Sequence, residues 1–406
     1  MRTTQGSLTA AALAVLASAP SAAAFPKFLR FSCSELVTER LDPIVFPGVP
    51  QSPHLHQIAG GNMFNVTMDP SRHDISSEAS CTTCTFAEDF SNYWTATLFF
   101  RARNGSYMAV PKRANLDFDG ARGGGMSVYY TPYRNVAVNV TAFAPGFRMT
   151  VGNPAFRTRA EGEAYRGLTF TCLDTMWTRT GETMHMPRRM CKEGIMANHR
   201  FPTCWDGVHL DSEDHQSHVA YPVNGTFADD ADCPASHPVR IPELFYEVIW
   251  DTRGFNDAEL WPEDGSQPFV WSFGDFTGYG THADYVFGWK GDALQRAMDA
   301  NCDFEVECEE LVTQSIEAGN QCRLEQNVPE DFAGWLESLP GGVEVTGPQP
   351  GDGSACSEGG TCDDDWEGPC EVVKWGQCGG TNWTGCTTCT PGTTCQFYTE
   401  DMDLCL

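Results

Sequence analysis

The sequence has few basic residues and no long apolar run. Its 406 residues contain 26 lysines and arginines against 54 aspartates and glutamates, a formal net charge of −28. This acidic excess argues against nucleic acid or an anionic membrane as a partner, whereas a neutral polysaccharide would meet no electrostatic penalty. No stretch after the N-terminus reaches the roughly 18 apolar residues of a membrane-spanning helix, so we expect no membrane anchor.

The N-terminus has the pattern of a signal peptide. Arg2 supplies a positive charge, residues 8–16 form a short apolar run, and Ala22 and Ala24 have the spacing that a signal peptidase recognises. We therefore expect cleavage after Ala24 and a mature chain that begins at Phe25. The protein is expected to be extracellular and monomeric.

All 18 cysteines lie beyond this signal, and an even number in a secreted chain indicates disulfide bonds. The spacing of Cys81 and Cys84 also suits zinc or redox exchange, but two half-cystines are favoured in a secreted chain. Five glycosylation sequons indicate surface loops: Asn65, Asn104, Asn139, Asn224 and Asn382.

Composition divides the chain into a large domain, residues 25–341, and a small module, residues 370–406. The segment between them, 342–369, is rich in Gly, Pro and Asp and is typical of an acidic linker. Ten cysteines precede the linker and six follow it, as expected if disulfides form within each domain. Cys356 and Cys362 inside the linker are expected to pair with each other.

The large domain has the pattern of a mainly β fold. Strands are predicted at 93–103, 126–133, 135–143, 168–172, 244–250 and 269–273. Asn104-Gly105 supplies a hairpin turn. Helical periodicity comes late, at 293–300, 308–318 and 330–339. Strands followed by helices predict a β-sandwich or jelly-roll-like domain with a few C-terminal helices.

The C-terminal module is too short to build a core of its own, so its cysteines must hold a small, disulfide-rich β fold. Spacing alone does not choose among the 15 pairings that six cysteines allow. Trp375 and Trp383 are large rings that so small a scaffold cannot hide. A ring stacked on a pyranose removes roughly 100 Å² of apolar surface from water, which contributes on the order of 2 kcal/mol.

Three motifs of this module resemble the fungal family 1 carbohydrate-binding module. They are Trp-Gly-Gln-Cys-Gly-Gly at 375–380, Gly-Thr-Thr-Cys at 392–395 and the final Cys-Leu at 405–406. The resemblance implies cellulose as the partner. It also implies three disulfides: Cys378–Cys395, Cys389–Cys405 and Cys370–Cys386.

The same resemblance implies that Trp375 and Gln377 lie on the cellulose-binding face. The sequence departs from the family just before the last cysteine, where Asp401 and Met402 replace two planar aromatic residues. Two outcomes stay open. Binding is weakened, or the face is shifted and built from Trp375, Trp383 and Tyr398.

Histidines are the candidate metal ligands of the large domain. His54 and His56 are spaced i, i+2 and would share one side of a strand. His215 and His218 are spaced i, i+3 and would share one face of a helical turn. Two or three neutral imidazoles with a carboxylate would suit Zn, Cu, Mn or Fe. The alternative is that each histidine separately hydrogen-bonds a backbone group. The candidates are His54, His56, His215, His218 and His282.

Carboxylates near these histidines are the candidate catalytic groups. Asp284 and Asp214 would serve as a further ligand or as a general base. A copper monooxygenase with an N-terminal histidine brace is disfavoured, because the expected mature chain begins at Phe25. A two-carboxylate glycosidase is a further possibility, but nothing marks a pair among Glu247, Asp251 and Asp284.

Long motifs across residues 28–341 resemble a fungal secreted family of domains of unknown function, often fused to wall-binding or cellulose-binding modules. They include SPHLHQIAGGNMFN at 52–65, HPVRIPELFYEVIWDT at 237–252 and GYGTHADYVFGW at 278–289. The resemblance implies that the histidine motifs belong to the shared domain, and it carries no activity. Two hypotheses follow. One is a metal-dependent enzyme acting on plant or fungal cell-wall polysaccharide. The other is a non-catalytic wall protein with structural histidines.

Overall fold

The computed structural model describes most of the large domain and parts of the C-terminal module. The described residues are 28–113, 123–132, 139–176, 181–223, 232–300, 302, 308–346, 371–372, 377–379, 387–389, 394–399 and 402–405. The predicted signal peptide, most of the predicted linker and residues 135–138 of the strand predicted at 135–143 lie outside them. The rest of that prediction is wrong, since residues 139–143 are described and form no strand. Cys356 and Cys362 lie outside them as well.

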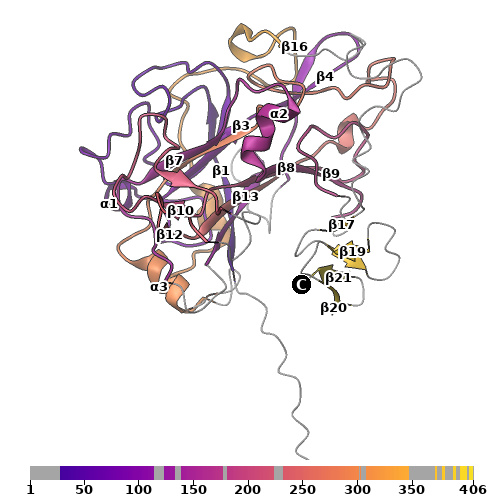
Figure 1. Ribbon diagram of the computed structural model, residues 1–406. Coiled ribbons are helices and arrows are strands. Elements are labelled where there is room, and N and C mark those ends of the chain that lie inside the picture. The colour runs from indigo at the N-terminus through magenta and orange to yellow at the C-terminus, as the bar shows by residue number, and fades with distance from the viewer. Residues whose placement is uncertain are drawn as a thin grey trace, which may run out of the picture.

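The large domain is built on one antiparallel sheet of nine strands (Figure 1). Alternating aromatic and β-branched residues along these segments favour strands that are buried on both faces. The strand order is β7-β15-β3-β2-β1-β6-β13-β9-β8. The strands are β1 Leu29–Glu39, β2 His56–Gly60, β3 Asn92–Ala96, β6 Gly125–Thr131, β7 Arg148–Gly152, β8 Leu168–Leu173, β9 Gly194–Arg200, β13 Glu243–Trp250 and β15 His282–Val286. The predicted mainly β fold is confirmed.

This sheet curls until it is nearly closed. The phenol oxygen of Tyr130 on β6 lies 2.9 Å from those of Tyr93 on β3 and Tyr285 on β15. Because β6 is three strands away from β3 in the order, these contacts require the two halves of the sheet to face each other. The end strands also approach, since a Cβ added to Gly152 of β7 would lie 2.8 Å from Leu168 of β8. The interior between the halves is the main core.

A second sheet, in the order β14-β4-β5-β16, lies at the end of the domain opposite α3 (Figure 1). Its strands are β4 Leu98–Arg101, β5 Tyr107–Ala109, β14 Phe269–Trp271 and β16 Trp335–Leu336. The hairpin between β4 and β5 turns at Gly105 with a φ of 88°, as predicted. The strand predicted at 93–103 is interrupted at Thr97, where the chain leaves the first sheet for the second. A small third sheet holds β10 Cys204–Trp205, β11 Val219–Ala220 and β12 Val239–Arg240.

The helices are short, and none in the described residues is long and apolar enough to cross a membrane. They are α1 Ile75–Glu78, α2 Arg159–Gly162, α3 Ala293–Asp299, α4 Ile316–Gln321 and the 3-10 turns η1 Glu163–Tyr165, η2 Arg253–Phe255 and η3 Pro340–Gly342. The helix predicted at 293–300 is confirmed as α3. The helix predicted at 308–318 is wrong over residues 308–315, because Val312 is held in a loop by a backbone hydrogen bond from Ala87; only its last residues lie in α4. The helix predicted at 330–339 is wrong, since β16 pairs there with β5.

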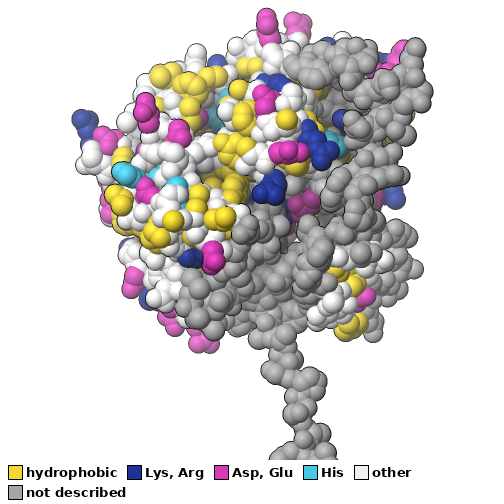
Figure 2. Space-filling view, in the orientation of Figure 1, with side chains coloured by type: hydrophobic (Ala, Val, Ile, Leu, Met, Phe, Trp, Pro, Cys, Tyr) yellow, Lys and Arg dark blue, Asp and Glu magenta, His cyan; other side chains and the backbone are white. Residues whose placement is uncertain are grey.

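Five disulfides cross-link the described part of the large domain. They are Cys33–Cys84, Cys81–Cys322, Cys172–Cys191, Cys204–Cys233 and Cys302–Cys308. Cys81 and Cys84 belong to two different bonds, which confirms that they are half-cystines and not a zinc or redox pair. Acidic side chains are spread around the visible face of the molecule rather than gathered in one patch (Figure 2).

The described parts of the C-terminal module form two small sheets. Their strands are β17 Glu371–Val372, β18 Gln377–Gly379, β19 Thr388–Cys389, β20 Cys395–Thr399 and β21 Met402–Cys405. The Cys378–Cys395 bond is present, as the resemblance implies. Cys389 is also disulfide-bonded. The predicted Cys370–Cys386 pair, Trp375 and Trp383 lie outside the described residues, and Gln377 and Tyr398 are described in their backbone alone.

Candidate metal centre

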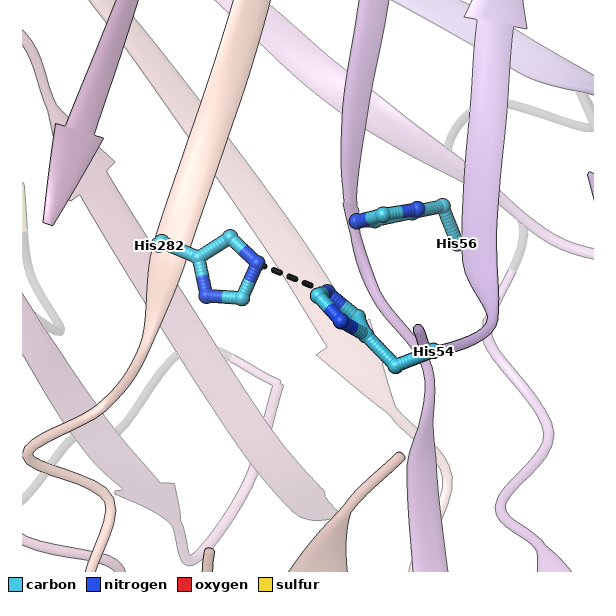
Figure 3. A group of neighbouring side chains, drawn as sticks. All are labelled: His54, His56 and His282. Atoms are coloured by element: carbon cyan, nitrogen blue, oxygen red, sulfur yellow. Dashed lines mark hydrogen bonds between the residues drawn. The ribbon is translucent and has the colours of Figure 1, made fainter. Parts of the chain in front are cut away.

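Three histidines meet where the two large sheets join. His56 begins β2 and His282 begins β15, and β3 lies between these strands in the sheet. His54 lies in the turn just before β2. The carbonyl oxygen of Leu55, between the two histidines, accepts hydrogen bonds from Thr97 N at 3.0 Å and from Ser272 Oγ at 2.7 Å. These bonds fix the turn against the second sheet, and Figure 3 shows the three rings turned toward one another.

The ring nitrogens are close enough to share one metal ion. Nε2 of His54 and Nε2 of His282 are 3.0 Å apart. One nitrogen from each of the three rings lies within 4.8 Å of the other two. Two nitrogen ligands of a tetrahedral ion, each at about 2.05 Å, stand roughly 3.3 Å apart. The observed spacing therefore admits a metal with small adjustments.

Backbone carbonyls fix the tautomers of two rings. His56 Nδ1 lies 3.0 Å from the oxygen of Leu41, and His282 Nδ1 lies 3.0 Å from the oxygen of Gly280. Each neutral ring therefore carries its proton on Nδ1 and its lone pair on Nε2. His54 must then donate its Nε2–H to His282. His56 Nε2 is buried and has no hydrogen-bond partner in the part of the chain that the structure describes, which is costly unless a hydrogen-bond donor or a cation satisfies it.

Burial keeps the three rings neutral. His54, His56 and His282 are 5%, 0% and 7% exposed. Desolvation lowers the pKa of His56 to about 4. Desolvation, together with the charge of His56, lowers the pKa of His282 to about 4. For the same reasons the pKa of His54 lies well below its usual range. At neutral pH all three rings are uncharged, and metal binding at the shared position requires that the His54 proton move from Nε2 to Nδ1, which frees the Nε2 lone pair.

Two buried carboxyl groups accompany this triad. Asp284 lies two residues after His282 on the same face of β15, and its Oδ2 has no hydrogen-bond partner among the described residues. Asp42 Oδ1 accepts backbone hydrogen bonds from Ile44 at 3.2 Å and from Val45 at 3.0 Å. Burial raises the pKa of both carboxyls, and the charge of Asp42 raises the pKa of Asp284 further. Burial therefore favours the protonated form of Asp284 over its charged form.

His215 and His218 form a separate group in the loop after β10. His218 uses both ring nitrogens, since Nδ1 lies 2.8 Å from Ser212 Oγ and Nε2 lies 2.9 Å from the oxygen of Arg148. His215 Nδ1 lies 2.7 Å from Asp211 Oδ1. His215 also has a φ of 58°, so these residues do not form the helical turn that their spacing predicts. The structure brings together three of the five predicted histidines and leaves these two apart.

Asp214, the other predicted catalytic carboxylate, caps the same loop. Its Oδ1 accepts hydrogen bonds from Ser212 Oγ at 2.8 Å, Gln216 N at 3.1 Å and Ser217 N at 2.8 Å. Partial burial raises the pKa of this carboxyl, but the hydrogen bonds from Ser217 and Gln216 outweigh it and lower the pKa. These contacts give Asp214 a local structural role.

The carboxylates considered for a glycosidase have partners of their own. Glu247 Oε2 accepts a hydrogen bond from Tyr129 at 2.6 Å, and Asp251 forms an ion pair with Arg253 at 2.6 Å. Asp284 lies beside the triad. The structure marks no catalytic pair among the three.

Sequence reasoning missed Asp42 and Phe273. Asp42 precedes Pro43, and an Asp-Pro pair signals a turn more readily than a functional site. The Phe273 ring centroid lies 5.2 Å from that of His54 and 4.9 Å from that of His282. The only local signal is its place in a Trp-Ser-Phe-Gly turn. The path of the folded chain brings both residues to the triad.

Two family models match the chain. The model of a domain of unknown function, DUF1996, matches residues 42–289, more than half of the chain. This range contains the triad, Asp42 and Asp284. The model of the fungal cellulose binding domain matches residues 374–400. No solved structure matches the chain.

Curated relatives share a short segment with this chain. AA9 family lytic polysaccharide monooxygenase E of Podospora anserina is 73% identical over 37 residues, 9% of this chain and 13% of that protein. AA9 family lytic polysaccharide monooxygenase B of the same fungus is 47% identical over 69 residues, 17% and 18% of the two chains. Endoglucanase EG-1 of Trichoderma longibrachiatum is 54% identical over 37 residues, 9% and 8% of the two chains. The chain spans less than a fifth of the length of each of these relatives.

Proposed function

Since the chain belongs to the DUF1996 family and carries a fungal cellulose-binding domain, we propose that it is a cellulose-anchored protein whose DUF1996 domain uses a transition metal in chemistry on cell-wall polysaccharide. The buried, unpartnered Nε2 of His56 beside two further imidazoles carries this proposal. The proposal includes secretion after cleavage at Ala24 and a monomeric state. The fungal cellulose-binding domain and the disulfides are typical of secreted proteins and support this location.

The donor set indicates which metals fit. Three neutral imidazoles suit Zn, Cu or Fe, whereas Mn prefers oxygen ligands and fits less well. The carbonyls of Leu41 and Gly280 orient two of the rings, as outer-shell partners do in known metal sites. A bound divalent ion would supply a Lewis acid or an activated water. Asp284, whose pKa is raised well above its usual range by burial, would provide a proton from the strand that carries His282.

The target is inferred from the C-terminal module. Anchoring on cellulose raises the concentration of the large domain at a solid surface, which favours a catalyst acting on that surface. The matched relatives are named as polysaccharide monooxygenases and an endoglucanase, which supports a polysaccharide as the partner of the module. The matches are too short to transfer a reaction to the DUF1996 domain.

The metal content of purified, dialysed protein tests the centre. We expect about one equivalent of transition metal per chain, lost in a His54→Ala/His56→Ala variant, because each imidazole supplies one of few ligands. His215→Ala is the matched control and should keep the metal. A metal-free chain whose thermal stability does not respond to added Zn, Cu or Fe would remove the centre from the proposal.

Binding to microcrystalline cellulose tests the module. Trp375→Ala should lower the bound fraction several-fold, since it removes one stacking ring. Trp335→Ala is the control, because Trp335 is a 47% exposed tryptophan of the large domain. Equal retention of wild type and Trp375→Ala would place the binding face on other rings, with Trp383, Tyr398 and the 72% exposed Phe397 as the candidates.

A non-catalytic wall protein is the second candidate function, and the burial of the triad favours it. The two candidates separate when metal-loaded protein is incubated with cellulose, xylan and mixed-linkage glucan. New soluble sugars or new chain ends that depend on His56 would support the enzyme. Binding without any change in the polysaccharide would support the second candidate.

A further inference from the structure

Phe273 contacts two of the triad histidines and also reaches the surface. Its ring packs against the rings of His54 and His282, and its side chain is partly exposed. The carbonyl groups that hold the other sides of the triad belong to Leu41 and Gly280, and both residues are buried. Among these neighbours Phe273 stands between the triad and the solvent.

The backbone that carries Phe273 is firmly held. Ser272 N donates to the oxygen of Thr97 at 2.8 Å, and Ser272 Oγ donates to the oxygen of Leu55 at 2.7 Å. Gly274 follows with a φ of 86°, and its N–H donates to Trp271 O at 2.7 Å. Because the turn is fixed on both sides of the ring, rotation of the side chain is the motion left to Phe273.

The ring fills the space in front of the triad closely. A Cβ added to Gly280 would lie 2.8 Å from Phe273 Cε2, so the glycine leaves room for the ring. Asp275 Oδ2 accepts the Gly280 N–H at 3.0 Å and holds this segment in place. The guanidinium carbon of Arg157 lies 5.8 Å from the ring centroid. The phenyl ring is therefore packed between Gly280, Arg157 and the two triad rings.

We propose that Phe273 is the gate of the triad and limits its ligand to a small molecule of the size of dioxygen, peroxide or azide. The inference rests on the metal centre proposed above and restricts it: the metal would not contact the sugar directly, and its chemistry on polysaccharide would pass through the small ligand. A pyranose ring needs an open surface of its own size, and the three histidines expose at most 7% of their area. A glucan chain therefore stays outside Phe273, and the ligand that reaches the metal is small.

Cobalt(II)-loaded protein tests the gate, because its visible spectrum reports the ligands of the metal, and azide serves as the small probe. Phe273→Ala should bind azide at least about tenfold faster than wild type and release cobalt faster to a chelator, since the phenyl barrier is gone. Phe273→Tyr keeps the ring and should behave like wild type. Phe276→Ala is the matched control, because this ring of the same segment is buried in a different cluster with Phe99 and Val270.

The outcomes separate the gate from the centre itself. Equal azide rates in wild type, Phe273→Ala and Phe273→Leu, all folded by circular dichroism, would overturn the gate while leaving the metal centre in place. A cobalt spectrum that responds to cellobiose in wild type would also overturn it, because a sugar would then reach the metal. Failure of wild type to take up cobalt would remove the metal centre and the gate together.

Discussion

The triad and the histidine pair of the loop after β10 differ in what their ring nitrogens face. His56 and His282 each give one nitrogen to a backbone carbonyl and turn the other toward the neighbouring rings. His218 is equally buried, but both of its nitrogens are engaged, by Ser212 and by Arg148. A metal ligand needs one nitrogen anchored and the other turned toward a position that further ligands share. Burial alone therefore does not identify a site, whereas the convergence of three ring nitrogens within 4.8 Å of one another does.

The two groups also differ in how they are assembled. The contacts of His215 with Asp211 and of His218 with Ser212 lie within one short loop and form locally. The triad joins β2 to β15 across β3, so it exists only when distant parts of the chain pair in register. The loop pair stabilises its own segment, and the triad depends on the whole sheet.

The largest expected effect is on metal affinity. His56→Ala should weaken binding of the native metal by at least about 100-fold, because one ligand of a three-histidine site is worth roughly 3 kcal/mol or more. His218→Ala should leave the affinity within about twofold, because its nitrogens have other partners. Competition with a chromogenic chelator measures both variants. Equal losses of metal affinity in the two variants would contradict the assignment of the metal to the triad.

Acid should destabilise the metal-free domain through the triad. The folded pKa of His56 and of His282 is about 4 against an ordinary value of 6.5, so between these values the unfolded chain binds protons that the folded chain does not. Stability is therefore fully retained above pH 6.5 and falls as the pH drops toward 4, by about 3 kcal/mol for each histidine.

Urea unfolding of metal-free protein at pH 7, 5.5 and 4 measures this loss. A His56→Ala variant should show a shallower fall, while the control His215→Ala should follow wild type. Identical unfolding midpoints at pH 7 and pH 4 in wild type would mean that the triad does not resist protonation.

In metal-free protein at neutral pH, alanine substitution should lower the free energy of unfolding more at His218 than at His56, the reverse of the order expected for metal affinity. His218→Ala removes two hydrogen bonds from a buried ring, and we expect a loss of about 2 kcal/mol in the free energy of unfolding of metal-free protein. His56→Ala should cost less, about 1 kcal/mol, because it also removes a buried nitrogen without a partner. Chemical unfolding at pH 7 compares them. A larger loss for His56→Ala would show that its Nε2 is satisfied in solution.

Local sequence patterns predict the strands and the candidate ligands, but they do not predict which histidines come together. Aromatic and β-branched alternation predicts strands such as β8 and β13, because the pleat has a period of two. Residue type alone marks His54, His56 and His282 as candidate ligands. The pattern does not separate them from His215 and His218, because the separation depends on the register of β2, β3 and β15.

Tertiary pairing also explains the errors. The segment 330–339 has helical spacing of apolar residues, yet Trp335 pairs with Met108 on the edge of the second sheet. Thr97 lies inside a continuous strand pattern, but the chain changes sheets there. Phe273 carries no ligating atom, so nothing in its residue type signals its place against the triad. Contacts between distant segments decided each of these positions.

The smallest expected effect compares the two carboxyl groups that accompany the two histidine groups. Asp284→Asn should change the free energy of unfolding at pH 7 by less than about 1 kcal/mol, because burial raises the pKa of this acid and so favours its neutral form, which an amide resembles. Asp214→Asn should cost about 1 kcal/mol, since an ionised acceptor of two backbone N–H groups is lost. Urea unfolding of both variants at pH 7 makes the comparison. If Asp284→Asn were the more damaging change, Asp284 would be ionised beside the triad, and a ligand role would replace the proton-holding role assigned to it.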